Sequence, residues 1–133
     1  MNRLFRIFLA AVATACAVSA HAQSCTGASL SPGQDVVGAI EAAAPGAVIC
    51  LNQGTYTPVG NHFAANIGTF AIGNNVTLRG APGLTPSQVV LQGGAGASYA
   101  VFVVGYIAGK SPAGATIQNL TIAGSQGGIQ LFN

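Results

Sequence analysis

Charged side chains are scarce in this chain of 133 residues, which holds four Lys or Arg residues and two Asp or Glu residues. Two of the four basic residues, Arg3 and Arg6, lie in an N-terminal segment that we predict to be removed. The remaining chain then balances Arg79 and Lys110 against its two acids and has no net charge. Nucleic-acid binding requires clustered Lys and Arg, and attraction to an anionic membrane surface requires a basic patch. The composition therefore predicts no nucleic-acid partner and no membrane partner for the mature chain.

Acidic and metal-ligating side chains are equally few. The mature chain has one Asp and one Glu, Asp35 and Glu41, and we expect both to face water. A calcium site needs several converging oxygen ligands, and glycoside hydrolysis needs two facing carboxyl groups. The sequence also lacks a Cys and His cluster, and the glycine-rich stretch 93–96 has no helix after it to bind a phosphate. We predict no catalytic residue, no metal site and no cofactor in this segment, and we expect His62 and Lys110 to be solvated surface residues.

The first 22 residues have the pattern of a secretory signal peptide. Arg3 and Arg6 form the positive segment, residues 7–18 the apolar core, and Ala20-His21-Ala22 the small-residue cleavage site. The apolar run is too short to cross a bilayer as a helix. We therefore predict cleavage after Ala22, and we expect residues 23–133 to form one small domain that is secreted, periplasmic or on the cell surface.

Cysteine is present three times, and Cys16 lies within the predicted signal peptide. The two that remain, Cys25 and Cys50, are an even number in an exported chain, which favours a disulfide bond. We predict that they are paired, with two free buried thiols as the alternative. The bond closes a loop of about 25 residues and contributes roughly 3 kcal/mol in the chain-entropy model.

One helix is predicted, near the start of the mature chain. Ser31 is the expected N-cap, with Pro32 at the first helical position and Gln34 completing a capping box. Pro45-Gly46 ends the helix. Apolar residues recur at a spacing of three to four and predict one buried stripe. The members of this stripe are Val36, Val37, Ile40 and Ala44.

Short strands are predicted for the rest of the chain. Nearly every candidate is rich in β-branched or aromatic residues and is bounded by Gly, Pro, Asn or Ser. No stretch after Ala44 has a helical period, and residues 58–68 are predicted to be a loop. The candidate strands are residues 47–51, 55–57, 69–72, 76–79, 89–92, 101–104, 115–117, 120–123 and 129–132.

Two stretches share the pattern Asn–apolar–Thr–apolar–x–Gly: Asn75–Gly80 and Asn119–Gly124. In each, alternate residues can point inward while Asn and Gly form the corners. This pattern resembles the repeat of the pectate lyase-like superfamily of parallel β-helix proteins. The resemblance implies an all-β fold, a right-handed parallel β-helix (solenoid) whose first coil is covered by the N-terminal amphipathic helix. A small β-sandwich with antiparallel pairing of the same strands is the alternative.

The number of coils is left open by the spacing of the two stretches. Asn75 and Asn119 are 44 positions apart. This interval fits either two coils of about 22 residues or one larger coil with an insertion at residues 105–114.

The resemblance also implies a function. Pectate lyases of this superfamily use clustered acids to bind calcium and an Arg as base; here Arg79 lies at a strand end without carboxylate partners. We therefore expect the N-terminal part of an exported protein that acts on or binds polysaccharide, with no complete active site in this segment. If the protein is a polysaccharide lyase or a glycoside hydrolase, we expect its catalytic residues beyond Asn133. The alternative is a non-catalytic surface adhesin or structural scaffold.

The end of the sequence predicts a piece of a longer chain. Residues 129–133 read as a strand with no capping segment after it. Terminal repeats of a solenoid need a polar outer face, so we expect further coils of the same polypeptide to be partners of this segment.

Overall fold

The computed structural model describes residues 24–105, 109–124 and 126–132. The predicted signal peptide and its cleavage site lie outside these residues. Within them no helix has the length and apolar character needed to cross a membrane. The elements are β1 (Ser29–Leu30), α1 (Val36–Ala42), β2 (Ala47–Leu51), β3 (Gly54–Tyr56), α2 (Phe63–Asn66), β4 (Phe70–Ile72), β5 (Val76–Gly80), the 3-10 helix η1 (Pro86–Gln88), β6 (Val89–Gln92), β7 (Tyr99–Val104), β8 (Thr116–Gln118), β9 (Thr121–Ala123) and β10 (Gly127–Phe132).

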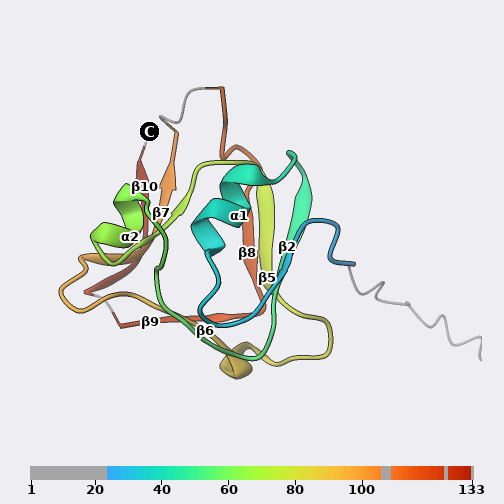
Figure 1. Cartoon of the computed structure of the whole chain (residues 1–133), viewed down its shortest axis with the longest axis horizontal. Helices are drawn as coiled ribbons and strands as arrows, with labels where there is room; N and C mark the ends of the chain where they lie inside the picture. The colour runs from blue at the N-terminus through green and yellow to red at the C-terminus, as the bar shows by residue number, and fades with distance from the viewer. Residues whose placement is uncertain (1–23, 106–108, 125, 133) are drawn as a thin grey trace, which may run out of the picture.

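The strands form three small sheets (Figure 1). Sheet A has the order β1-β2-β5-β8, sheet B the order β3-β6-β9, and sheet C the order β10-β7-β4. Every described pairing is parallel. From β2 onward the chain visits sheets A, B and C in that order three times. Side chains from all three sheets meet in one apolar core, which includes Leu51, Leu78, Leu91, Phe70 and Ile72.

The predicted right-handed parallel β-helix is corrected to this arrangement of three small sheets of short parallel strands with few helices. The prediction depended on treating Asn75–Gly80 and Asn119–Gly124 as equivalent repeats. The structure places them in different sheets, because the first contains β5 of sheet A and the second contains β9 of sheet B. The two stretches are alike because each is a short half-buried strand between corners, and the same residue types suit any such strand.

The paired strands are also separated by unequal lengths of chain. The interval is 28 residues from Val101 to Ile129 and 39 residues from Thr77 to Thr116. No constant repeat relates the strands, and the longer of these two intervals contains residues 105–114, where an insertion is predicted from the sequence. The alternative β-sandwich is wrong as well, because it requires antiparallel pairing and every described pairing is parallel.

Helix α1 lies across the centre of the triangle that the three sheets form in Figure 1. Its residues Val36, Val37 and Ile40 are buried in the core, and the helix packs against β4. The apolar stripe is thus confirmed at three of its four positions, whereas Ala44 follows the helix and is exposed. The apolar face of this helix covers the core beside the first strand of each sheet, so the apolar side chains there are removed from water.

The predicted start of α1 is wrong. Asp35 is the N-cap, and its carboxylate accepts a hydrogen bond of 2.9 Å from the Gly38 N–H. Ser31 and Gln34 contact each other one turn earlier, where the Ser31 N–H donates to Gln34 Oε1 at 2.6 Å. Gly33 has a φ of 87°, a left-handed conformation that interrupts a right-handed helix. The residues predicted as a capping box therefore close a turn before the helix.

The predicted strands agree well with the described ones. The bounds of β2 and β6 match the prediction, and those of the other predicted strands differ by one or two residues. Three elements were missed: β1, which has two residues, and α2 and η1, each about one turn long. α2 lies within the predicted loop 58–68, because a single turn is too short to show a helical period.

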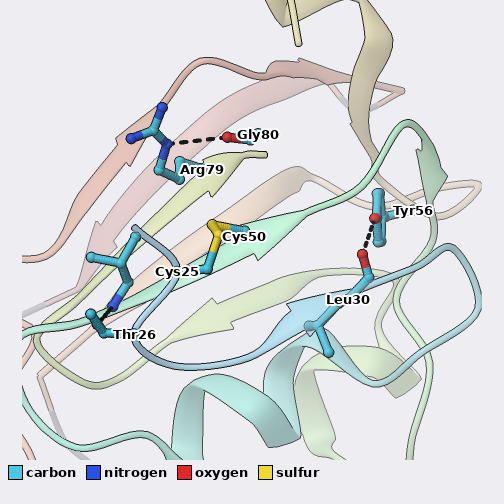
Figure 2. Close-up of a disulfide and its surroundings, with 8 residues drawn as sticks. Cys25, Thr26, Leu30, Cys50, Tyr56, Arg79 and Gly80 are labelled. Carbon is cyan, nitrogen blue, oxygen red and sulfur yellow. Dashed lines mark hydrogen bonds between the residues drawn. A yellow bond between two sulfur atoms is a disulfide. The ribbon is translucent and has the colours of Figure 1, made fainter. Parts of the chain in front are cut away.

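The predicted disulfide is confirmed. Cys25 and Cys50 are joined, with their Cα atoms 5.6 Å apart (Figure 2). The bond ties the segment before β1 to the buried strand β2, with which β1 pairs. The Tyr56 hydroxyl lies nearby, 2.7 Å from the Leu30 carbonyl oxygen, and burial raises the pKa of this tyrosine to about 12. Together these contacts attach the first strand of sheet A to the core.

The corner residues behave only in part as predicted. Asn119 has a φ of 53° and donates from its side chain to the Leu84 carbonyl oxygen at 2.9 Å, so its role in a bend is confirmed. Gly124 also has a positive φ, 76°. Gly80 instead ends β5, where a Cβ would collide with the Asn119 carbonyl oxygen. The buried corner amide before β5 belongs to Asn74, which binds carbonyl oxygens at the C-terminal end of α1.

Candidate functional site

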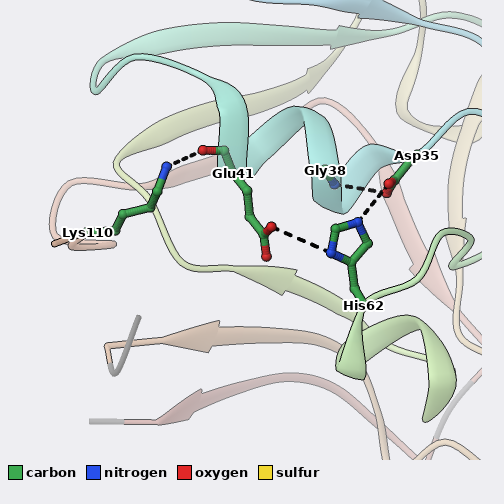
Figure 3. Close-up of polar contacts among 5 residues, drawn as sticks. All are labelled: Asp35, Gly38, Glu41, His62 and Lys110. Carbon is green, nitrogen blue, oxygen red and sulfur yellow. Dashed lines mark hydrogen bonds and ion pairs between the residues drawn. The ribbon is translucent and has the colours of Figure 1, made fainter. Parts of the chain in front are cut away.

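A cluster of titratable side chains joins α1 to the segment before α2 (Figure 3). His62 Nε2 lies 2.7 Å from Asp35 Oδ2, and His62 Nδ1 lies 3.5 Å from Glu41 Oε2. The two carboxylates come from the N-cap and the last turn of α1, and the imidazole bridges them. The cluster holds both acids of the predicted mature chain together with its one histidine.

Local structure explains how these side chains meet. One carboxylate oxygen of Asp35 accepts the hydrogen bond from the Gly38 N–H in the first turn of α1. The other carboxylate oxygen is therefore free to contact His62. His62 is the N-cap residue of α2, yet its ring makes no cap hydrogen bond and contacts α1 instead. The segment around α2 is thereby attached to the helix that covers the core.

The contacts shift the pKa of both principal partners. The hydrogen bond to Asp35 raises the pKa of His62, against the effect of burial, and the negative charges of Asp35 and Glu41 raise it further. Burial by itself raises the pKa of Asp35, but the hydrogen bonds from Gly38 and His62 outweigh burial and lower it. Each group thus stabilises the charged form of the other. The ion pair is complete between the lowered pKa of Asp35 and the raised pKa of His62.

A hollow of about 340 Å³ opens beside this cluster. Glu41, Asn61 and His62 supply polar groups to its wall, and Phe63 and Phe102 supply aromatic rings. The remaining lining residues are the aliphatic Val37, Ala64, Ala71 and Val104. The combination of an apolar wall with a few polar groups at one side is typical of sites that bind small organic molecules.

Two aromatic rings, an exposed one and a half-buried one, line the hollow. Phe63 has 72% of its surface exposed, although it begins α2. Phe102 stands on sheet C between two other rings: Phe132 packs edge-on against it with centroids 5.0 Å apart, and Tyr99 lies at 5.8 Å. An isolated exposed Phe needs no explanation, but a group of rings next to polar groups in a hollow indicates a binding surface.

The other residues considered from the sequence lie outside this hollow. Lys110 is not simply solvated, because its Nζ donates to the Glu41 carbonyl oxygen (Figure 3). It also lines a separate hollow with Pro45 and Asn75. Arg79 lies on sheet A, where its Nε donates to the Gly80 carbonyl oxygen at 3.1 Å (Figure 2). Among the described residues, no group of three or more His, Cys, Asp or Glu side chains is arranged to hold a metal ion.

The comparisons with known proteins add no relative. No family model matches the chain, and no curated protein and no solved structure matches it either. The resemblance to the pectate lyase-like superfamily therefore stays a prediction, and the site must be interpreted from its own residues.

Sequence reasoning missed this site. It predicted that Asp35 and Glu41 face water and that His62 is solvated, whereas the structure brings all three together with about a quarter to two-fifths of each side chain exposed. Asp35 and His62 are 27 positions apart, and no local pattern in the sequence signals their contact. The one available signal was the small number of ionisable residues. In a chain with so few of them, a contact between the single His and the two acids of the mature chain could have been considered.

Proposed function

We propose that this chain is part of an exported protein that binds polysaccharide, and that the hollow beside His62 is its saccharide-binding site. The observation that carries the proposal is the placement of an exposed aromatic ring, Phe63, and a half-buried one, Phe102, beside the polar residues Glu41, Asn61 and His62 around one hollow.

Saccharides have the matching chemistry. A sugar ring presents an apolar C–H face, which packs against an aromatic ring, and hydroxyl groups around its edge, which donate and accept hydrogen bonds. The rings of Phe63 and Phe102 offer the apolar contact. Glu41 offers acceptors, and Asn61 offers both donors and an acceptor. The volume of about 340 Å³ is at the small end of ligand sites, which suits a single sugar unit of a longer chain.

Export is supported by the disulfide bond. The Cys25–Cys50 bond is compatible with an extracellular location, because disulfides persist in oxidising compartments. The signal-peptide pattern of residues 1–22 supports the same destination. Polysaccharides of cell walls and matrices are found in that compartment.

Binding, rather than hydrolysis, is the activity that the described groups support. Hydrolysis of a glycosidic bond needs two carboxyl groups on either side of the scissile bond. Asp35 and Glu41 instead face the two nitrogens of one imidazole. Asp35 also accepts a hydrogen bond from the Gly38 N–H as the N-cap of α1.

The test compares two alanine variants of equally exposed residues. Phe63, 72% exposed, lines the hollow, and Leu131, 71% exposed, does not. Binding of the exported protein to neutral, amino and uronic oligosaccharides is measured by calorimetry. We expect Phe63→Ala to weaken binding by about two- to tenfold, the value of one aromatic contact, and Leu131→Ala to leave it unchanged. Equal loss in both variants, or no binding of any saccharide by the wild type, contradicts the proposal and favours the alternative of a structural scaffold.

A further inference from the structure

We propose that the hollow selects saccharides that carry a protonated amine, namely amino sugars, over saccharides that carry a carboxylate. This inference rests on the proposed function and names the ligand class of the same site. It differs from the ligand that the resemblance implies, because pectate is a chain of uronic acids.

The charge of the cluster favours a cation. Asp35 and Glu41 contribute two negative charges, and a protonated His62 contributes one positive charge, so the three groups together keep a charge of −1. Deprotonation of His62 makes this charge −2. Lys110 does not line this hollow: its ammonium group donates to the backbone carbonyl of Glu41, and the residue lines the neighbouring hollow. Glu41 is the carboxylate that lines the hollow, and it would repel a uronic carboxylate placed there.

Glu41 keeps acceptor capacity for a ligand. Its Oε2 lies 3.5 Å from His62 Nδ1, at the outer limit of a hydrogen bond, and its side chain is 39% exposed. Asp35, in contrast, is engaged at 2.7 Å by His62 and at 2.9 Å by Gly38. Glu41 is therefore the carboxylate of the cluster that can accept a hydrogen bond from a sugar ammonium group.

The aromatic rings independently favour a positively charged ligand. The face of an aromatic ring is negative and attracts a cation that approaches it closely. Phe63 and Phe102 line the hollow together with Glu41. A cationic sugar can therefore place its apolar face or its ammonium group on a ring while the carboxylate accepts a hydrogen bond. A uronic acid can place its apolar face on a ring too, but it has no ammonium group for the ring face or for the carboxylate.

The experiment uses three oligosaccharides of equal length: oligoglucosamine, its N-acetylated form and oligogalacturonate. Affinity for the exported protein is measured at mildly acidic pH, where the sugar amine is protonated. We expect oligoglucosamine to bind about two- to fivefold more tightly than the acetylated form, the range of an exposed ion pair. We expect oligogalacturonate to bind more weakly than both. Raising the salt concentration should remove the preference for the amine and leave binding of the acetylated form unchanged.

The variant Glu41→Gln separates charge from shape. It keeps the size of the side chain and removes its negative charge, so it should remove most of the preference for oligoglucosamine over the acetylated form. The salt dependence of the wild-type protein tests the same claim without any substitution. Equal binding of the charged and acetylated forms, or tighter binding of oligogalacturonate, overturns the inference but leaves a saccharide site in place. Failure of all three to bind overturns the proposed function itself.

Discussion

The two ends of the core differ in how they are covered. At one end lie β1, β3 and β4, the first strands of their sheets, and α1 buries Ile40 completely among them. At the other end lie β8, β9 and β10, the last described strands, and none of their residues is fully buried. Ile129 and Leu131 of β10 are 47% and 71% exposed.

The difference shows that the core of this molecule depends on neighbouring layers rather than on the strands alone. Strands of similar composition are buried when another layer or a helix lies beside them and are exposed when none does. In the part of the chain that the structure describes, α1 is therefore the element that completes the core. The His62 cluster contacts α1 directly, and the disulfide holds the segment before β1 to β2. Four measurements test this comparison.

The largest effect is expected for a core deletion under α1. Ile40→Ala leaves a cavity beneath the helix and should lower the free energy of unfolding by about 3 kcal/mol. Ile129→Ala at the open end should cost less than about 1 kcal/mol, because about half of that side chain is already in water. Urea denaturation of both variants measures the contrast. Similar losses at the two ends would show that β10 is covered in solution.

Removal of the disulfide should have the next largest effect. The double variant Cys25→Ser and Cys50→Ser frees the segment before β1 from β2. We expect a loss of about 3 kcal/mol, the value for a loop of this length in the chain-entropy model. Thermal melts of the variant and of the reduced wild type should agree. A loss below about 1 kcal/mol would show that the hydrogen bonds of Tyr56 and β1 already hold this segment.

Substitution of Asp35 separates its two roles. Asp35→Ala removes the cap of α1 and the partner of His62, and we expect it to cost about 1 to 2 kcal/mol. Asp35→Asn keeps a side-chain oxygen for the Gly38 N–H and should cost less than half as much. Denaturation at neutral pH compares the two. Equal costs would assign the whole effect to the ion pair and none to the cap.

The smallest effect is the pH dependence of the cluster. The pKa of His62 is raised in the folded protein, so its contribution is complete below the ordinary value of 6.5 and is lost as pH rises through the folded pKa. The pKa of Asp35 is lowered, so its contribution is present above 3.8 and is lost as pH falls. Because both side chains are partly exposed, we expect the ion pair to contribute only about 0.5 kcal/mol to stability, or a few degrees in Tm.

Melting curves measured from acidic to mildly basic pH should show a decline in Tm above pH 6.5 in the wild type and not in His62→Gln. An unchanged slope in the variant would exclude His62 as its source.

The sequence by itself determined where the strands lie and which cysteines pair. Short apolar runs between Gly, Pro and Asn place β2 and β6 at their predicted bounds, because burial and corner residues are local properties. The Cys25–Cys50 bond followed from number and context, since only two cysteines remained outside the predicted signal peptide.

Only the tertiary structure decided which strands are neighbours and which polar side chains meet. β5 and β9 carry the same pattern but belong to different sheets. The alternation of inward and outward residues is the same for every half-buried strand, so it does not determine which strands pair. The contact of His62 with Asp35 spans 27 residues and depends on how α1 lies over the core. That position is set by the burial of Val36, Val37 and Ile40 against residues from all three sheets, and no local pattern in the sequence specifies it.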